Sequence, residues 1–259
     1  MKSSGFHRIA GANLWVEQCS FDPDQTQPTL IFLHEALGSV ALWKGYPTLL
    51  CQALQCNGVI YDRIGHGLSD PFNAVRTNDY LEIEARQYLH ELIQTLGLKK
   101  PILVGHSDGG TIALIYAAQF PDLVSGIITE AAHIYVENTG AQGMQTAIYQ
   151  FEHTIFKEKL AKYHGEKTEA LFYAWADTWT SETFSSWNIT AQLPNITCPA
   201  LILQGDKDEY AQQQHMWDIV EGIGENTQGV LVENCGHIPH LQAQEKTLEL
   251  SIEFIKKLY

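Results

Sequence analysis

The sequence PILVGHSDGGTIALIYAA, residues 101–118, decides the fold. Its start, Ile102 to Val104, is a short apolar run typical of a buried strand. The residues Gly105-His106-Ser107-Asp108-Gly109 follow directly, and a longer apolar stretch of helical length begins at Gly110. A strand, a tight turn and a helix in this order present a serine hydroxyl at the tip of the turn, with glycine on both sides where a side chain would collide. We therefore predict that Ser107 is a nucleophile.

Similar short apolar runs recur on both sides of this stretch and alternate with longer segments of helical period. This alternation predicts an α/β fold with a mostly parallel central sheet and helices on both faces. Strands buried on both faces are nearly all apolar. By this criterion the sequence predicts strands at 29–34, 58–62, 101–105, 124–129, 200–204 and 229–233.

Two helical stripes accompany these strands. Apolar residues from Leu81 to Leu96 recur at helical spacing and end at Gly97, and a second stripe runs from Leu248 to Tyr259. The segment 134–189 breaks the pattern, because it has no convincing strand and is rich in aromatic residues. We predict a core of residues 1–133 and 190–259, and a helical cap formed by the insertion 134–189.

A serine hydroxyl needs a nearby base, and the base needs a carboxylate to orient it. Acid candidates follow the predicted strand at 200–204, where Asp206 and Asp208 stand, and base candidates follow the last predicted strand, where His237 and His240 stand. Their order along the chain, serine, acid, histidine, is the order that a nucleophile at such a strand-to-helix turn requires. Spacing alone does not decide which aspartate is the acid or which histidine is the base.

At this point the chain resembles the α/β-hydrolase superfamily, in particular its serine esterase and lactonase branch with a helical cap. The resemblance extends from the strand before His34 to the final helix. It implies a catalytic triad of Ser107, His237 and Asp208, since the family places its acid in a Gly-x-x-Asp pattern. It also implies an oxyanion hole formed by the backbone N–H groups of Ala36 and Asp108.

The loop after the first predicted parallel strand differs from the family pattern, because Glu35 replaces the usual glycine. His34-Glu35 does not begin a zinc-binding HExxH motif, since Gly38 stands where the second histidine is required. The carboxylate of Asp108 has two possible roles. It caps the following helix, or it faces the pocket and favours amines over anions.

Four residues are candidates for contacting substrate: Glu35, His133, Trp175 and Trp179. For the two tryptophans the competing interpretation is a place in the cap's own core, and for His133 it is a buried, hydrogen-bonded histidine.

Composition excludes several classes of partner and cofactor. The net charge of -14 would repel nucleic acid and anionic lipid. The five cysteines show no CxxC spacing, and no apolar run is long enough for a signal peptide or membrane helix, so we expect a cytoplasmic protein. The segment Asp62 to Ser69 resembles an architectural turn of the family, and Asp70 stands where a dinucleotide fingerprint needs glycine. We expect no cofactor and no metal.

These observations predict a serine hydrolase that cleaves a small carboxylic ester or lactone through an acyl-enzyme on Ser107. The alternatives are a hydrolase of amino-acid esters, which some α/β hydrolases with a similar Ser-Asp-Gly-Gly turn act on, or a hydrolase of thioesters or C–C bonds. A non-catalytic receptor of the same fold is disfavoured, since a receptor has no need of serine, acid and histidine in this order.

Overall fold

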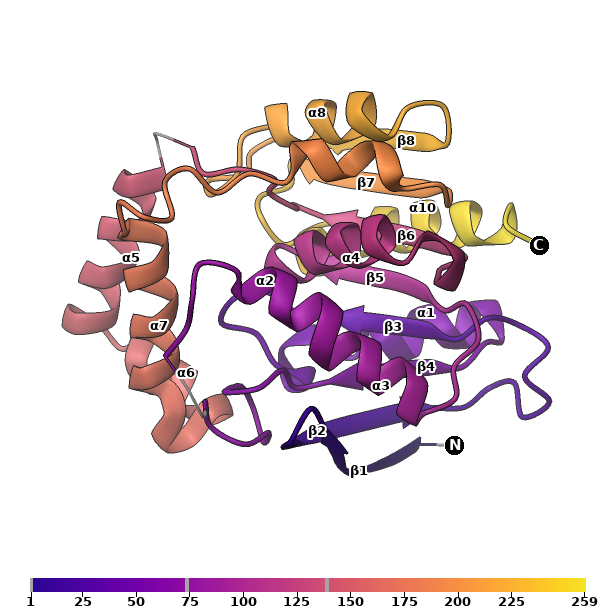
Figure 1. Cartoon of the computed structure of the whole chain (residues 1–259), viewed down its shortest axis with the longest axis horizontal. Coiled ribbons are helices and arrows are strands. Elements are labelled where there is room, and N and C mark those ends of the chain that lie inside the picture. The colour runs from indigo at the N-terminus through magenta and orange to yellow at the C-terminus, as the bar shows by residue number, and fades with distance from the viewer. Residues whose placement is uncertain (1, 73–74, 138–139) are drawn as a thin grey trace.

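The central sheet carries the predicted strands in one layer. The structure, a computed structural model, describes residues 2–72, 75–137 and 140–259. Within these residues, eight strands form one sheet in the order β1-β2-β4-β3-β5-β6-β7-β8 (Figure 1). The strands are β1 (Lys2–Ile9), β2 (Ala12–Cys19), β3 (Leu30–Leu33), β4 (Gly58–Tyr61), β5 (Ile102–His106), β6 (Gly126–Glu130), β7 (Ala200–Gly205) and β8 (Thr227–Val232). All pairs from β4 to β8 are parallel, so the predicted α/β fold class is confirmed.

The strands β1 and β2 were not predicted from the sequence. They form an antiparallel hairpin, and β2 also pairs antiparallel with β4. The hairpin turns through Ala10 and Gly11, whose φ angles of 47° and 82° suit the twist of a tight hairpin. The alternation of buried Ala12, Leu14 and Val16 on β2 is the period-two signal that could have revealed it.

Helices cover both faces of the sheet (Figure 1). They are α1 (Tyr46–Leu54), α2 (Tyr80–Ile83), α3 (His90–Thr95), α4 (Asp108–Gln119), α5 (Gly140–His153), α6 (Phe156–His164), α7 (Thr168–Thr180), α8 (Gln214–Ile223), α9 (Pro239–Gln242) and α10 (Gln244–Lys256). Short 3-10 helices occur at Val40–Trp43, Pro121–Leu123, Gly165–Lys167 and Thr190–Asn195. The helix predicted from Leu81 to Leu96 is α2 and α3 joined by a π-helical segment, Glu84–Leu89.

Two apolar cores lie on opposite faces of the sheet, because neighbouring strand residues point to opposite sides. Ile31 and Leu33 pack with α4 and α8 on one face, whereas Leu30 and Phe32 pack with α1 and α10 on the other. The central strands are thus buried on both faces, which explains why their sequences are apolar throughout.

The helices α5, α6 and α7 lie together beside the sheet (Figure 1). They enclose an apolar cluster of their own, in which the rings of Phe151 and Phe172 stack with centroids 3.8 Å apart. Leu37, from the loop after β3, packs against the same cluster. The segments that lead into and out of these helices run side by side, since Tyr135 and Asn188 form an antiparallel bridge.

Candidate active site

The turn between β5 and α4 presents Ser107. This residue has φ 53° and ψ -117°, a strained conformation for a residue with a side chain. A Cβ atom on Gly105 would collide with the carbonyl of Gly109, and one on Gly109 would collide with the carbonyl of Leu33. The two glycines are therefore required by close backbone approach, as the sequence predicts. The side chain of Ser107 stands at the carboxyl end of β5, where the loops after the other parallel strands also meet.

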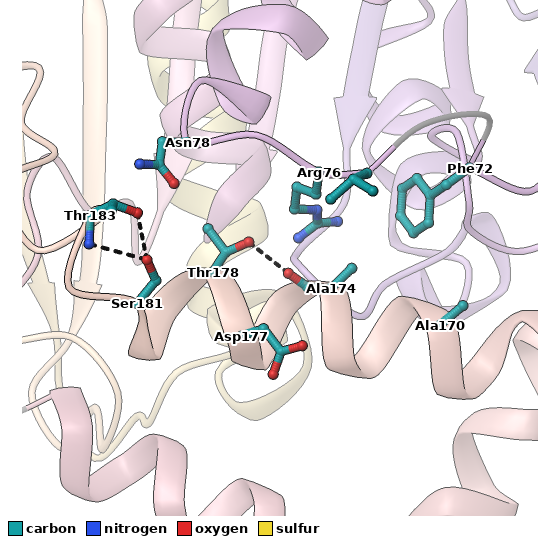
Figure 2. A pocket seen from close by; sticks show the side chains of 10 residues that line it. Phe72, Arg76, Asn78, Ala170, Ala174, Asp177, Thr178, Ser181 and Thr183 are labelled. Atoms are coloured by element: carbon teal, nitrogen blue, oxygen red, sulfur yellow. Dashed lines mark hydrogen bonds between the residues drawn. The ribbon is translucent and has the colours of Figure 1, made fainter.

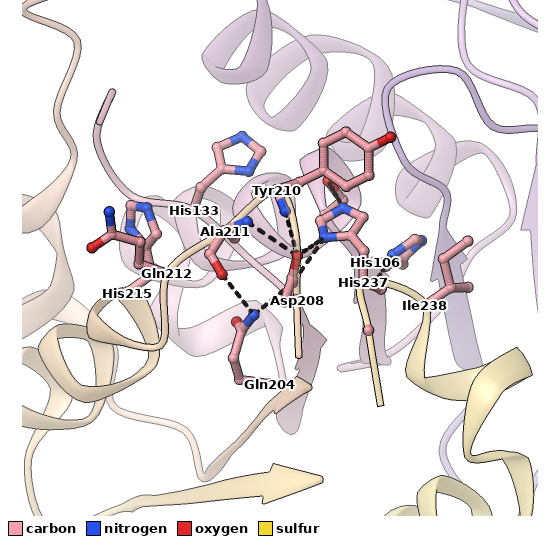
Figure 3. Close-up of polar contacts among 12 residues, drawn as sticks. His106, His133, Gln204, Asp208, Tyr210, Ala211, Gln212, His215, His237 and Ile238 are labelled. Atoms are coloured by element: carbon pink, nitrogen blue, oxygen red, sulfur yellow. Dashed lines mark hydrogen bonds and ion pairs between the residues drawn. The ribbon is translucent and has the colours of Figure 1, made fainter. Parts of the chain in front are cut away.

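His237 and Asp208 complete a hydrogen-bonded chain from the serine. His237 Nε2 lies 3.1 Å from Ser107 Oγ. His237 Nδ1 lies 2.9 Å from each carboxylate oxygen of Asp208 (Figure 3). An Nδ1–H that donates to Asp208 leaves the Nε2 lone pair free to accept the serine proton. The three predicted residues are thus brought together in the order that a proton transfer needs.

The carboxylate of Asp208 is fixed by groups that the sequence analysis did not single out. Its Oδ1 accepts from the N–H groups of Tyr210 (2.8 Å) and Ala211 (3.1 Å), and its Oδ2 accepts from Gln204 Nε2 (2.6 Å) (Figure 3). Burial opposes ionisation, but the contact with His237 holds the pKa of Asp208 below its ordinary value. The charged form is therefore the stable one beside the imidazole.

Asp206 and His240, the other candidates for the acid and the base, lie outside the hydrogen-bonded chain of Ser107, His237 and Asp208. Asp206 Oδ1 accepts from the N–H of Cys235 at 3.0 Å, which ties the β7 and β8 loops together. His240 is buried, and its Nδ1 donates to Glu130 Oε2 at 2.8 Å. Both residues hydrogen-bond to segments around the site. In the described part of the chain, neither of them contacts Ser107.

The predicted oxyanion donors lie in the segments that follow the carboxyl ends of β3 and β5. Ala36 follows β3, and Asp108 is the first residue of α4. In the described part of the chain, neither N–H donates a hydrogen bond to another protein group. Glu35 keeps a negative φ, so the loop does not need the glycine found in the family pattern.

The Glu35 side chain pairs with His106. Its Oε2 lies 3.5 Å from His106 Nδ1, and His106 Nε2 donates to the carbonyl of His237 at 2.8 Å. Although burial opposes the imidazolium, the Glu35 carboxylate raises the pKa of His106, and His106 in turn lowers the pKa of Glu35 to about 2. A Cβ at Gly38 would collide with this carboxylate, so glycine makes room for it. The pair links the loop after β3 to the loop that carries His237.

Neither predicted role describes the carboxylate of Asp108, which is only 1% exposed. It accepts from Tyr80 Oη at 3.0 Å, and it lies 3.6 Å from Arg63 Nη2 and 3.4 Å from His133 Nε2. Burial would raise the pKa of Asp108, but His133 and Arg63 hold it well below its ordinary value. The charge is thus satisfied inside the protein and is not free to bind an amine.

Two of the remaining candidates lie in contact. The rings of Trp179 and His133 pack edge to face, with their centroids 4.6 Å apart. Trp179 Nε1 donates to Tyr80 Oη at 3.1 Å. Trp175 instead packs on Phe172 in the apolar cluster of α5–α7, as the competing interpretation expects.

A cavity of about 690 Å³ opens between α7 and the segment before α2 (Figure 2). Phe72, Arg76 and Thr178 are among the residues that line it. None of the described lining residues is Ser107, His237 or Asp208. Arg76 lies over the ring of Tyr80, 4.3 Å from its centroid, and Tyr80 bonds Asp108, so the cavity borders the cluster around Asp108.

Among the described residues there is no side-chain cluster typical of a metal site and no helix typical of a membrane span. No group of three or more histidine, cysteine or acidic residues there is placed to hold a metal ion. None of the described helices has the length and apolar character needed to cross a membrane.

Comparisons with known proteins agree with this architecture. A family model described as "Alpha/beta hydrolase family" matches residues 30–250. Proline iminopeptidase of Saccharolobus solfataricus is 26% identical over 98% of this chain and 93% of its own. Human serine hydrolase BPHL is 28% identical over 76% of this chain and 69% of its own. The crystal structure of the enol-lactonase from Burkholderia xenovorans LB400 superposes with a TM-score of 0.75 at 16% identity, covering 97% of this chain and 100% of that one.

Proposed function

The chain belongs to the alpha/beta hydrolase family, and from this premise we propose that it is a serine hydrolase that cleaves a small carboxylic ester or lactone. The observation that carries the proposal is the unbroken hydrogen-bonded chain from Ser107 through His237 to Asp208. Such a chain converts a weakly nucleophilic hydroxyl into one that attacks carbonyl carbon.

The reaction has two halves. Ser107 Oγ attacks the carbonyl carbon while His237 Nε2 takes the hydroxyl proton, and the leaving alcohol departs with that proton as the acyl-enzyme forms. A water molecule then attacks the carbonyl carbon of the acyl-enzyme while His237 takes its proton. His237 returns this proton to Ser107 Oγ as the bond between Oγ and the acyl group breaks and the acid product leaves. Asp208 keeps the second ring nitrogen protonated and stabilises the imidazolium in both halves.

The N–H groups of Ala36 and Asp108 would bind the negative oxygen of each tetrahedral intermediate. Removal of one such donor costs about 3–4 kcal/mol of transition-state stabilisation in other hydrolases. Two donors that are free of protein acceptors support this assignment.

The segment 134–189 would act as a cap over the acyl group. Contacts between Leu37 and the cluster of α5–α7, and between Trp179 and His133, support a cap seated on the loops that carry the site. Glu35, His133 and Trp179 are the residues we propose along the substrate path, whereas Trp175 packs in the core of the cap. All five cysteines are buried and none of them forms a disulfide, which supports a reducing, cytoplasmic location.

A neutral acyl group fits the site better than an aminoacyl group. The carboxylate that would have to bind an amine, Asp108, is already engaged by Tyr80, Arg63 and His133. The triad by itself is equally able to cleave thioesters and amides, and one relative carries the name proline iminopeptidase.

A substrate panel tests this proposal. The neutral substrates are p-nitrophenyl acetate, butyrate and octanoate, one γ-lactone, one δ-lactone and a thioester with a matched acyl group. The aminoacyl substrates are the p-nitrophenyl esters of proline and valine and the p-nitroanilide of proline. The proposal expects the highest kcat/KM for a neutral ester or lactone, and no turnover by Ser107→Ala. A prolyl or valyl substrate faster than every neutral ester by tenfold or more would reassign the substrate class.

A further inference from the structure

The loop after β3 is held through its carbonyl groups. The carbonyl oxygen of Glu35 accepts from Arg63 Nη2 and from His34 Nδ1, each at 2.8 Å, and from the N–H of Gly38 at 3.0 Å. His34 is free to donate through Nδ1 because its Nε2 accepts from the N–H of Arg63. Three donors therefore hold the Glu35 carbonyl in one direction.

That direction also sets the direction of the Ala36 N–H. The Glu35 carbonyl and the Ala36 N–H belong to one planar trans peptide, in which C=O and N–H point to opposite sides. Rotating the N–H away from its present direction would break the bonds to Arg63 and His34. The Ala36 N–H, which donates to no acceptor among the described residues, is in this way held in a fixed direction in which it can bind an oxyanion.

The same guanidinium nitrogen reaches the second donor residue. Arg63 Nη2 lies 3.6 Å from Asp108 Oδ2, and both side chains are almost fully buried, at 2% and 1% exposure. Asp108 is held further by Tyr80 Oη on the same oxygen. One buried group thus contacts both the loop after β3 and the first residue of α4.

Packing alone does not require an arginine here. Burial of a guanidinium carries a desolvation penalty, and an apolar side chain of similar volume avoids it. Arg63 Nε has no hydrogen-bond partner among the described residues, so the fold does not use the full donor set of this side chain. The two contacts that Nη2 does make converge on the residues that carry the two oxyanion donors.

We propose that Arg63 is a positioning residue that orients both halves of the oxyanion hole, through the Glu35 carbonyl and the Asp108 carboxylate. The inference rests on the proposed function, since it concerns the transition state of that reaction. Arg63 does not touch the substrate, so its removal should change the rate of acylation more than the binding of substrate.

The test uses two variants of the full-length chain, Arg63→Lys and the double variant Arg63→Met with Asp108→Asn, which removes both charges of this buried pair. Tyr61→Phe is the matched control, because it removes a buried hydrogen bond (3.0 Å) from β4 to Glu84 of the π-helical segment and leaves the loop after β3 unchanged. For each variant we would measure kcat, KM, the Kd of a phenylboronic acid that forms a tetrahedral adduct on serine, the Ki of the carboxylic acid product, and Tm.

We expect the double variant to lose roughly 10- to 100-fold in kcat, less than the loss of a whole donor. Its KM and product Ki should stay within about threefold of wild type, and boronate affinity should fall by about the same factor as kcat/KM. Arg63→Lys keeps a cation but cannot make both contacts, so its kcat should fall by more than threefold and by less than that of the double variant. Tyr61→Phe should lower Tm and leave the ratio of boronate to product affinity unchanged.

The inference is overturned if either folded Arg63 variant keeps kcat and boronate affinity within threefold of wild type. If the double variant fails to fold, Arg63→Lys alone decides by the same criterion. Failure of the proposed function looks different: the wild type itself would neither turn over esters nor react with a fluorophosphonate at Ser107. Complete fluorophosphonate labelling of the variants, at a lower rate, would show that Ser107 remains in place.

Discussion

Replacing Asp208 by asparagine tests the role of the carboxylate that contacts His237. The N–H groups of Tyr210 and Ala211 donate to Oδ1, whereas only Gln204 Nε2 donates to Oδ2, so an asparagine keeps more hydrogen bonds with its oxygen at the Oδ1 position. Its NH₂ group then takes the place of Oδ2, 2.9 Å from His237 Nδ1. From that position it donates to Nδ1 and favours the tautomer with the proton on Nε2, which faces Ser107 and cannot accept the serine proton.

The lost charge sets the size of the effect. A carboxylate and an imidazolium whose atoms are 2.9 Å apart attract by about 6 kcal/mol at an effective dielectric constant near 20. This energy is present only when the imidazole is protonated, so kcat should fall by a factor on the order of 10⁴. KM should change little, because the carboxylate does not face the substrate.

The assay is steady-state hydrolysis of the best ester of the panel, with Asp206→Asn as the matched control. Asp206 bonds a backbone N–H of the β8 loop and makes no contact with His237, so its variant should lose less than about tenfold. Equal losses in the two variants, or a loss of less than about 100-fold in Asp208→Asn, would refute the reasoning.

Three further outcomes follow from the same geometry. His237→Ala should abolish turnover, whereas His240→Ala should keep at least a tenth of kcat while lowering Tm; the reverse result in ester hydrolysis would reassign the base. Glu35→Gln should destabilise the protein most between about pH 4.5 and 6.5, where the carboxylate is ionised and its imidazole partner is charged. Thermal melts should show the difference from wild type shrinking above this window, as the imidazolium loses its proton, and below it, as the carboxylate of the wild type gains one. Gly105→Ala should prevent folding, because the new Cβ would collide with a backbone carbonyl. Gly143→Ala in α5 places its Cβ in open space and should be neutral or slightly stabilising. Equal yields of soluble protein and equal Tm values for the two variants would contradict this.

The sequence predicts the sheet well where strands are buried on both faces, since a short apolar run such as Ile102 to Val104 has few other uses. It fails at β1, whose residues Lys2–Ile9 are largely polar at the edge of the sheet. The π-helical segment at Glu84–Leu89 gives no periodic signal of its own, because its flanks keep the helical stripe.

The site shows the same division between local and long-range information. The turn around Ser107 is local in sequence, and the Gly-x-x-Asp spacing selects the aspartate that meets His237. The cluster of Asp108 with Tyr80 and Arg63 joins three segments far apart in the chain, so nothing in the spacing indicates it. The guanidinium of Arg63 was visible only as part of a turn that the resemblance marks as architectural.

The central claim is that an acyl-enzyme forms on Ser107, and mass spectrometry tests it most directly. The protein is mixed with a slowly hydrolysed p-nitrophenyl ester, quenched in acid within the first turnovers and digested. The account predicts a burst of p-nitrophenol close to one equivalent, an acyl group on the peptide that contains Ser107, and neither signal in Ser107→Ala. An acyl group on another residue, or a Ser107→Ala variant that keeps kcat within tenfold of wild type, would contradict it.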